Sequence, residues 1–142
     1  MSDPRLSDPP IKTFLATREV VTLATVQPDG SPLAMAMWHL PDDDTLVMIS
    51  VDGLAKVRNL RRDPRVAVVA EAGTRADVRG VAVQGRAEFL ADGPGRRALA
   101  ERFLARYEPN LARLWGGRAM PANRVMFRIL PDRVRSWGLG GV

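Results

Sequence analysis

The chain lacks cysteine and has a single histidine, His39, which excludes most self-contained catalytic machinery. Disulfide frameworks, thiolate zinc sites, iron–sulfur clusters and cysteine nucleophiles all require cysteine. A Ser-His-Asp triad would have to use His39, and the sequence contains no G-x-S-x-G elbow to accompany it. The glycine-rich end, residues 138–141, is not followed by a helix, so it is not a dinucleotide fingerprint. An enzyme with this inventory is expected to take its reactivity from an organic cofactor.

Long apolar runs are also missing. The longest cover residues 20–26 and 33–38, whereas a membrane span needs about 20 residues. The first ten residues are polar and include three prolines, which is not the pattern of a secretory signal. The 142 residues are 46% hydrophobic and 26% charged, as in an ordinary globular domain. We therefore expect a cytoplasmic protein without a membrane partner, forming one domain over residues 1–142 with flexible ends at 1–9 and 138–142.

The chain does contain short β-branched or alternating segments separated by turn sequences such as P-D-G-S-P at residues 28–32. They predict strands over 20–26, 33–40, 45–50, 65–70, 81–89, 125–129 and 133–137, with a turn at Pro131-Asp132 between the last two. Helical spacing predicts helices from Ser7 to about Arg18 and over 53–63 and 94–107, with a further turn or two at 109–115. Short hairpins indicate an antiparallel sheet. The predicted fold is mainly β: a six- to seven-stranded antiparallel β-barrel with peripheral helices.

Positive charge is concentrated in one short segment. The chain has 21 basic and 16 acidic residues, and residues 53–65 contain a single carboxylate beside five cations: Lys56, Arg58, Arg61, Arg62 and Arg65. Lys56 falls in the first turn of the predicted helix, where unpaired backbone N–H groups favour an anion. Ser50 and Asn59 lie close enough in sequence to add hydrogen bonds. The segment predicts an anion cradle, with a solvated basic helix face as the open alternative. Nucleic acid is not expected as a partner, because no aromatic residues interleave these cations.

Two other polar features have structural interpretations beside functional ones. Asp42-Asp43-Asp44 is expected to form a hairpin turn, with metal binding as the less favoured alternative. His39 ends an apolar strand and is expected to be a partly buried histidine, with haem ligation kept as an alternative. No metal site is predicted.

The order of these segments resembles the pyridoxamine 5′-phosphate oxidase-like split β-barrel proteins, from about Ile11 to Trp137. The most specific piece is Lys56-x-x-Asn59-Leu60 followed by D-P-R-V at residues 63–66. The ending L-P-D-R-V-R-S-W, residues 130–137, is similar to the terminal strand of the family. Within it the chain looks closest to the branch that uses the deazaflavin F420, and FMN-binding members share the fold. The resemblance implies a split β-barrel and a homodimer with two equivalent cofactor sites at the subunit interface.

The resemblance also implies which residues bind the cofactor. Those that would hold its phosphate are Lys56, Ser50, Arg58 and Asn59. Those that would lie beside its ring are Met35, Ala36, Met37 and Trp38. Trp137 matches an aromatic residue of the terminal strand that lies near the ring in members, where the partner subunit can supply it. Judged by residue type alone, the two methionines fit a core strand, and the two tryptophans fit packing at the barrel mouth.

The expected function is that of an F420H2-dependent oxidoreductase, which passes a hydride between the deazaflavin and an unsaturated small molecule. No catalytic side chain is identified, because stacking the substrate within hydride distance of the ring would suffice. The alternatives are an FMN-dependent oxidoreductase of the same fold and a non-catalytic module that binds a flavin, a deazaflavin or haem. Pyridoxamine 5′-phosphate oxidases proper carry an arginine in the stretch that matches residues 50–56 and a C-terminal Arg/His set. Both are absent here, so pyridoxamine phosphate oxidation is not expected.

Overall fold

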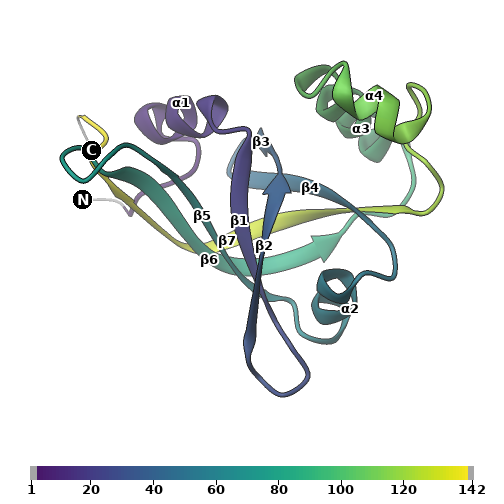
Figure 1. Ribbon diagram of the computed structural model, residues 1–142, viewed down its shortest axis with the longest axis horizontal. Coiled ribbons are helices and arrows are strands. Elements are labelled where there is room, and N and C mark those ends of the chain that lie inside the picture. The colour runs from purple at the N-terminus through teal and green to yellow at the C-terminus, as the bar shows by residue number, and fades with distance from the viewer. Residues whose placement is uncertain (1–2, 141–142) are drawn as a thin grey trace.

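A strongly curled antiparallel sheet organises the molecule, which the computed structural model describes over residues 3–140 (Figure 1). Its strands are β1 (Val20–Val26), β2 (Pro32–Trp38), β3 (Leu40–Asp42), β4 (Thr45–Val51), β5 (Arg65–Ala72), β6 (Arg79–Phe89) and β7 (Arg124–Trp137). They pair in the order β2-β1-β5-β6-β7-β4-β3. Within residues 3–140, β2 and β3 are edge strands that do not pair with each other, so the barrel stays split. The predicted mainly β, antiparallel split barrel with peripheral helices is confirmed.

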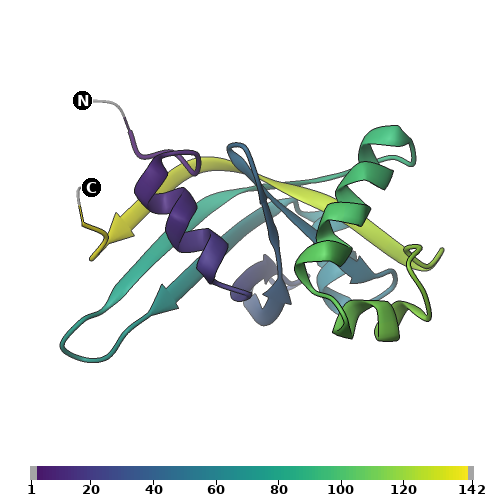
Figure 2. The ribbon, with the colours of Figure 1, turned by 90° about the horizontal axis from the view of Figure 1, so that it is seen from above.

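The helices are α1 (Pro9–Thr17), α2 (Ala55–Arg62), α3 (Pro94–Arg106) and α4 (Asn110–Trp115). Both views place α3 and α4 together at one end of the long axis, with α1 away from them (Figures 1 and 2). In Figure 1, α2 lies at the same end as α3 and α4 but on the other side of the strands. No helix within residues 3–140 is both long and apolar enough to cross a bilayer.

Two apolar clusters hold the fold together. The first fills the inside of the curled sheet, where Leu23, Met48 and Phe127 meet α1 residues such as Phe14. The second lies between the opposite face of β4 and helices α3 and α4, around Phe103. Alternate residues of β4 therefore serve different clusters, as the two-residue period of a strand requires. A hydrophobic helix face thus packs on each side of this part of the sheet.

The predicted turn at Pro131-Asp132 is wrong, because residues 124–137 form one continuous strand, β7. Its pairing with β6 shifts register at this point: Gln84 faces Arg133, while Gly85 faces Pro131, which leaves Asp132 as an extra residue. The pairing of β7 with β4 ends at Ile129, so proline follows the last pairing on one side and sits at the irregularity on the other. Strands tolerate proline at edges and bulges, and here it bends the strand without ending it.

The predicted strand over residues 33–40 is also interrupted. It ends at Trp38, and β3 begins at Leu40, so His39 separates two strands. The backbone N–H of His39 donates to the hydroxyl of Tyr107 at 2.9 Å, and that hydroxyl lies 2.7 Å from the His39 carbonyl oxygen. A side chain 68 residues away therefore takes the backbone groups that a continuous strand would use in a ladder.

The N-terminal segment makes more contacts than a flexible end would. Leu6 is buried in the first apolar cluster. The Ser7 hydroxyl donates to Asp44 Oδ1 at 2.6 Å, and Arg5 forms an ion pair with the same carboxylate. These contacts anchor residues 5–8 of the segment 1–9 that we expect to be flexible. At the other end Leu139 packs partly against the same cluster, and residues 141–142 of the predicted flexible tail lie outside the described residues.

Candidate functional site

A cavity of about 440 Å³ lies between β2 and β4 and is bordered by helices α2, α3 and α4; we call it the β2–β4 cavity. Its apolar lining consists of Val20, Ala36, Met37, Trp38, Ile49, Val51, Leu54, Phe103, Leu111, Leu114 and Trp115. Its polar lining consists of Ser50, Lys56 and Arg124. Five residues of the predicted site therefore lie together here: Ala36, Met37, Trp38, Ser50 and Lys56. The cavity is an apolar slot with a cationic end.

Ser50 supplies a buried hydroxyl to this cavity. It stands next to last in β4, paired with Val125 of β7, and is only 6% exposed. Its Oγ makes no hydrogen bond within the described structure. A buried hydroxyl without a partner costs about 1–3 kcal/mol, so such a group usually meets a ligand or an ordered water. Ser50 is therefore suited to donate to an anion bound in the cavity.

Lys56 lies in the first turn of α2, which begins at Ala55. No side chain caps this helix end, and its first turn contains no acidic residue. Partial burial lowers the pKa of the Lys56 ammonium from its ordinary value. No carboxylate within residues 3–140 forms an ion pair with it. The helix dipole and the ammonium therefore both favour a negative group at this end of the cavity.

The other four cations of the predicted cradle are engaged within the chain. Arg58 and Arg62 each donate to a backbone carbonyl oxygen. Arg61 and Arg65 each pair with a nearby aspartate, at 3.3 Å and 2.7 Å. None of the four lines the cavity. The anion cradle that the sequence predicts over residues 53–65 thus reduces to Lys56 and the helix end that carries it.

Asn59 and Arg58, expected beside the phosphate, do not line the cavity. Asn59 is 4% exposed, and its Nδ2 donates to Thr25 Oγ1 of β1 at 3.0 Å. This bond fastens α2 to the sheet and so holds Lys56 at the cavity. Within the described structure, Asn59 therefore contributes to the site through the position of the helix.

Two of the residues expected near the ring also lie elsewhere. Met35 belongs to β2 but does not line the cavity, and it is 40% exposed. Trp137 ends β7 and packs against Gly80, where a Cβ would come within 2.3 Å of the indole. Since Trp137 is outside the cavity of its own chain, its predicted role requires the partner subunit and stays a prediction.

Arg124 and the α3–α4 wall are parts of the cavity that the sequence interpretation missed. Arg124 lies one residue before the strand predicted over 125–129, and its signal is no more than a charge at the start of a strand. The spacing of Leu111, Leu114 and Trp115 gives α4 one apolar side, which could have identified it as a wall. Leu114 is 66% exposed, so the mouth of the cavity has an apolar rim.

His39 does not contribute to this cavity. It is 0% exposed, and its Nε2 donates to the backbone oxygen of Arg18 at 2.5 Å. Its Nδ1 is buried without a partner within the described structure. Burial, with a smaller effect of the neighbouring Arg106 charge, lowers the pKa of His39 to about 4. The ring is therefore neutral at pH 7. Because His39 does not line the cavity, it is not among the residues that would hold a haem there.

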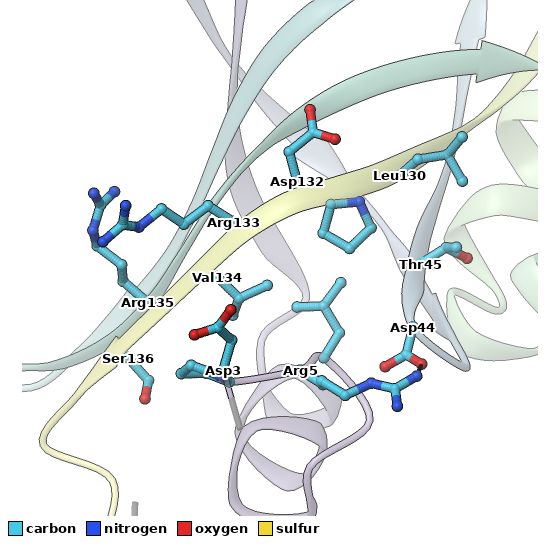
Figure 3. A pocket seen from close by; sticks show the side chains of 13 residues that line it. Asp3, Arg5, Asp44, Thr45, Leu130, Asp132, Arg133, Val134, Arg135 and Ser136 are labelled. Carbon is cyan, nitrogen blue, oxygen red and sulfur yellow. Dashed lines mark hydrogen bonds and ion pairs between the residues drawn. The ribbon is translucent and has the colours of Figure 1, made fainter. Parts of the chain in front are cut away.

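A larger groove, of about 1020 Å³, runs between the N-terminal segment and the second half of β7 (Figure 3). Several of its charged side chains are already paired: Arg5 with Asp44, and Asp132 with Arg86. It contains none of the predicted site residues. The β2–β4 cavity, whose cations and Ser50 hydroxyl have no carboxylate partner within residues 3–140, is therefore the better candidate site.

The acidic hairpin, Asp42-Asp43-Asp44, has two of its carboxylates bound by arginines. Asp42 accepts from Arg102 and Arg128, each at 2.7 Å, and these bonds lower its carboxyl pKa. Asp44 is held by Arg5 and Ser7. No group of three or more potential metal ligands occurs in the described part of the chain.

The residues that line the β2–β4 cavity fit a planar apolar ring with a phosphate group. Trp38 is fixed by stacking on Tyr107, with ring centroids 4.5 Å apart and planes 6° apart. This gives the slot a rigid aromatic wall, as ring-binding pockets commonly have. The orphan hydroxyl of Ser50 and the ammonium of Lys56 are the donors that a phosphate needs.

Comparison with known proteins identifies the family and the fold. The model of the pyridoxamine 5′-phosphate oxidase family matches residues 7–138. The crystal structure of the conserved hypothetical protein Rv2991 from Mycobacterium tuberculosis is 31% identical, with a TM-score of 0.81 over 99% of this chain and 89% of that one. An FAD-binding protein from Mesorhizobium loti is 26% identical, with a TM-score of 0.69 over 88% and 87%. HutZ, the haem storage protein from Vibrio cholerae, is 18% identical and shares the fold, with a TM-score of 0.78 over 94% and 96%. Because the family match spans nearly the whole described structure, the chain belongs to the pyridoxamine 5′-phosphate oxidase family.

Proposed function

We propose that the protein is an F420H2-dependent oxidoreductase that transfers a hydride between the deazaflavin and an unsaturated small molecule. The observation that carries the proposal is the β2–β4 cavity, where an apolar slot ends at Lys56 and the orphan hydroxyl of Ser50. F420 combines a planar ring with a phosphate and a carboxylate-rich tail, so a cationic end without carboxylates suits it. The expectation of a cytoplasmic protein stays a prediction.

In this proposal the chain binds and orients, and the coenzyme supplies the hydride chemistry. Lys56 and Ser50 hold the phosphate, and the exposed backbone at the start of α2 adds N–H donors. Ala36, Met37 and Trp38 flank the ring. The apolar wall of α3 and α4 excludes water and leaves room for an acceptor beside the ring. Rate enhancement then comes from proximity and orientation.

We also propose that the protein acts as a homodimer. Two rows of paired residues cross the outer face of β2, β1, β5, β6 and β7, and none of their members is buried. The rows are Ala36-Thr22-Val69-Ala82-Arg135 and Ala34-Ala24-Ala67-Gln84-Arg133. Four members of each row are small or uncharged, so another sheet can approach closely. Because Ala36 also lines the cavity, a second copy seated on this face would close its open side.

An FMN-dependent oxidoreductase of the same fold is the second candidate function. It is favoured by the FAD-binding relative, since the same slot would accept an isoalloxazine ring. A haem-binding module is less well supported, because His39 lies outside the cavity.

A fluorescence titration of the purified protein with F420, FMN and FAD tests the proposal. We expect F420 to bind with micromolar or tighter affinity. Lys56→Met removes a charge-assisted hydrogen bond, so it should weaken binding by about 10- to 100-fold. The chain has one other lysine, Lys12, which is exposed on α1, so Lys12→Met is the matched control and should bind as the wild type does. Binding of FMN without F420 would transfer the proposal to the FMN-dependent function.

A further inference from the structure

The cationic end of the β2–β4 cavity contains two positive side chains and no negative one. Lys56 and Arg124 line it, whereas none of the 16 acidic residues of the chain does. No ion pair joins either cation to a carboxylate anywhere in residues 3–140. At the acidic hairpin, by contrast, Arg5, Arg102 and Arg128 each pair with an aspartate.

The two cations come from segments that are tied together. Arg124 begins β7 and pairs with Val51, the last residue of β4. Immediately after this pair, the backbone N–H of Asp52 donates to the carbonyl oxygen of Asn123 at 2.8 Å. The chain then turns into α2, where Lys56 lies in the first turn. Lys56 and Arg124 therefore flank the same end of the cavity.

The guanidinium of Arg124 has hydrogen-bonding capacity to spare. Its one side-chain bond in the described structure goes from Nη1 to the neutral Oδ1 of Asn123, at 2.6 Å. Its backbone is held more firmly, because its N–H donates to Pro121 and its carbonyl oxygen accepts from Arg96 at 3.2 Å. A guanidinium has five N–H donors in a planar fork that matches a phosphate or a carboxylate. β7 thus holds the Arg124 guanidinium at this end of the cavity with most of its N–H donors unused.

Two like charges at one end of a partly buried cavity disfavour each other, and a ligand that supplies negative charge relieves this repulsion. A ligand with one negative charge would leave one of them uncompensated. Ser50, 6% exposed and without a partner in the described structure, adds a third group that awaits an acceptor. This end of the cavity therefore has the charge of a dianion site.

Resting on the proposed function, we propose that Arg124 is a second anion-binding residue of this site. It selects ligands whose anionic end carries at least two negative charges, beside the group that Lys56 and Ser50 hold. Two kinds of ligand meet this requirement: a phosphate monoester such as that of FMN, and a phosphodiester followed by a carboxylate, as in F420. The same ring without phosphate does not.

Titrations of wild type, Arg124→Gln and Arg75→Gln with four probes test the assignment. The probes are FMN, riboflavin, F420 and the phosphate-free deazaflavin fragment of F420. Arg75 is an exposed loop arginine outside the cavity, so its variant is the matched control. Arg124→Gln should weaken binding of FMN, F420 or both by about 10-fold or more and that of the uncharged probes by less than about 2-fold. The charged probe that loses affinity identifies which anionic end is held.

Three results would overturn the assignment, and only one of them would also refute the proposed function. An equal loss for charged and uncharged probes would make Arg124 a structural residue. Unchanged affinities for Arg124→Gln, together with weaker binding by Lys56→Met, would refute the role of Arg124 and leave the proposed function intact. Failure of the wild type to bind any of the four probes would refute the proposed function and the assignment with it.

Discussion

At the scale of single residues, His39 makes stability depend on pH. Its pKa is about 4 in the folded protein, because burial opposes the charged ring, against about 6.5 in the unfolded chain. Between these values the unfolded state binds more protons, so stability is complete above pH 6.5 and is lost as the pH falls. We expect the free energy of unfolding to be lower by about 2 kcal/mol at pH 5 than at pH 7.5.

Urea unfolding of the wild type and of His39→Gln at the two pH values measures this effect. The variant has no titrating ring, so its stability should change far less between pH 7.5 and pH 5. The carboxylate of Asp63 does not interfere, because the Arg65 guanidinium holds its pKa at about 2. A wild type that loses no stability between the two pH values would show that His39 is not buried in its neutral form.

Asn59 should act on stability and much less on binding. Its amide bonds to Thr25 inside the structure, so Asn59→Ala leaves a buried hydroxyl with one partner fewer. The expected cost is about 1–3 kcal/mol in the free energy of unfolding. Coenzyme affinity, measured where the variant remains folded, should fall by less than about 3-fold. A loss as large as that of Lys56→Met would mean instead that Asn59 touches the ligand.

The position of a single residue in the site could be predicted where it depends on neighbouring residues in the sequence. The common location of Lys56 and Ser50 was predictable, because one lies at the end of a strand and the other at the start of the helix that follows it. The engagement of Arg58 and Arg62 by backbone carbonyls was not, because their partners depend on how α2 docks on the sheet. Arg124 was missed for the same reason: it reaches the cavity through pairing with β4, which lies more than 70 residues earlier.

At the scale of elements, Gly85 should be essential to the shape of β6 and β7. A Cβ at this position would lie 2.2 Å from the carbonyl oxygen of Leu130, beside the register shift. The neighbour is backbone and cannot move cheaply, so Gly85→Ala should destabilise the protein by about 1–3 kcal/mol. The matched control is Gly95→Ala in the first turn of α3, where a Cβ would meet nothing within 4 Å. Helix propensity predicts a gain of up to about 1 kcal/mol there. Equal stabilities of the two variants in urea unfolding would contradict the bulge argument.

The hairpin strands were predictable because their turns and residue types are local signals, and β1 begins and ends where predicted. The exceptions were decided by distant contacts. Tyr107 of the segment after α3 interrupts the strand at His39, and the absence of a β4 partner beyond Ile129 lets proline sit inside β7. Sequence patterns place turn residues well, but whether such a residue turns the chain or bends a strand depends on the neighbouring strand.

At the scale of the whole molecule, the open side of the cavity and the exposed rows of small residues lead to one prediction. If a second copy covers the rows, a large charged side chain at their centre should separate the subunits. Ala67 is exposed, lies in the middle of its row on β5 and belongs to neither apolar cluster. The Ala67→Arg variant should therefore fold normally. We expect a dimer for the wild type and a monomer for this variant in light scattering coupled to size exclusion.

The same variant should also bind coenzyme less tightly, by about 10-fold or more, because the cavity would stay open to water on the side that Ala36 lines. Ala98→Arg adds the same charge at an exposed position on α3 away from the rows, so it should remain dimeric and bind normally. A wild type that is monomeric yet binds coenzyme would refute the dimer and preserve the site, because Lys56 and Ser50 belong to one chain. A dimer that survives Ala67→Arg would place the interface on another face.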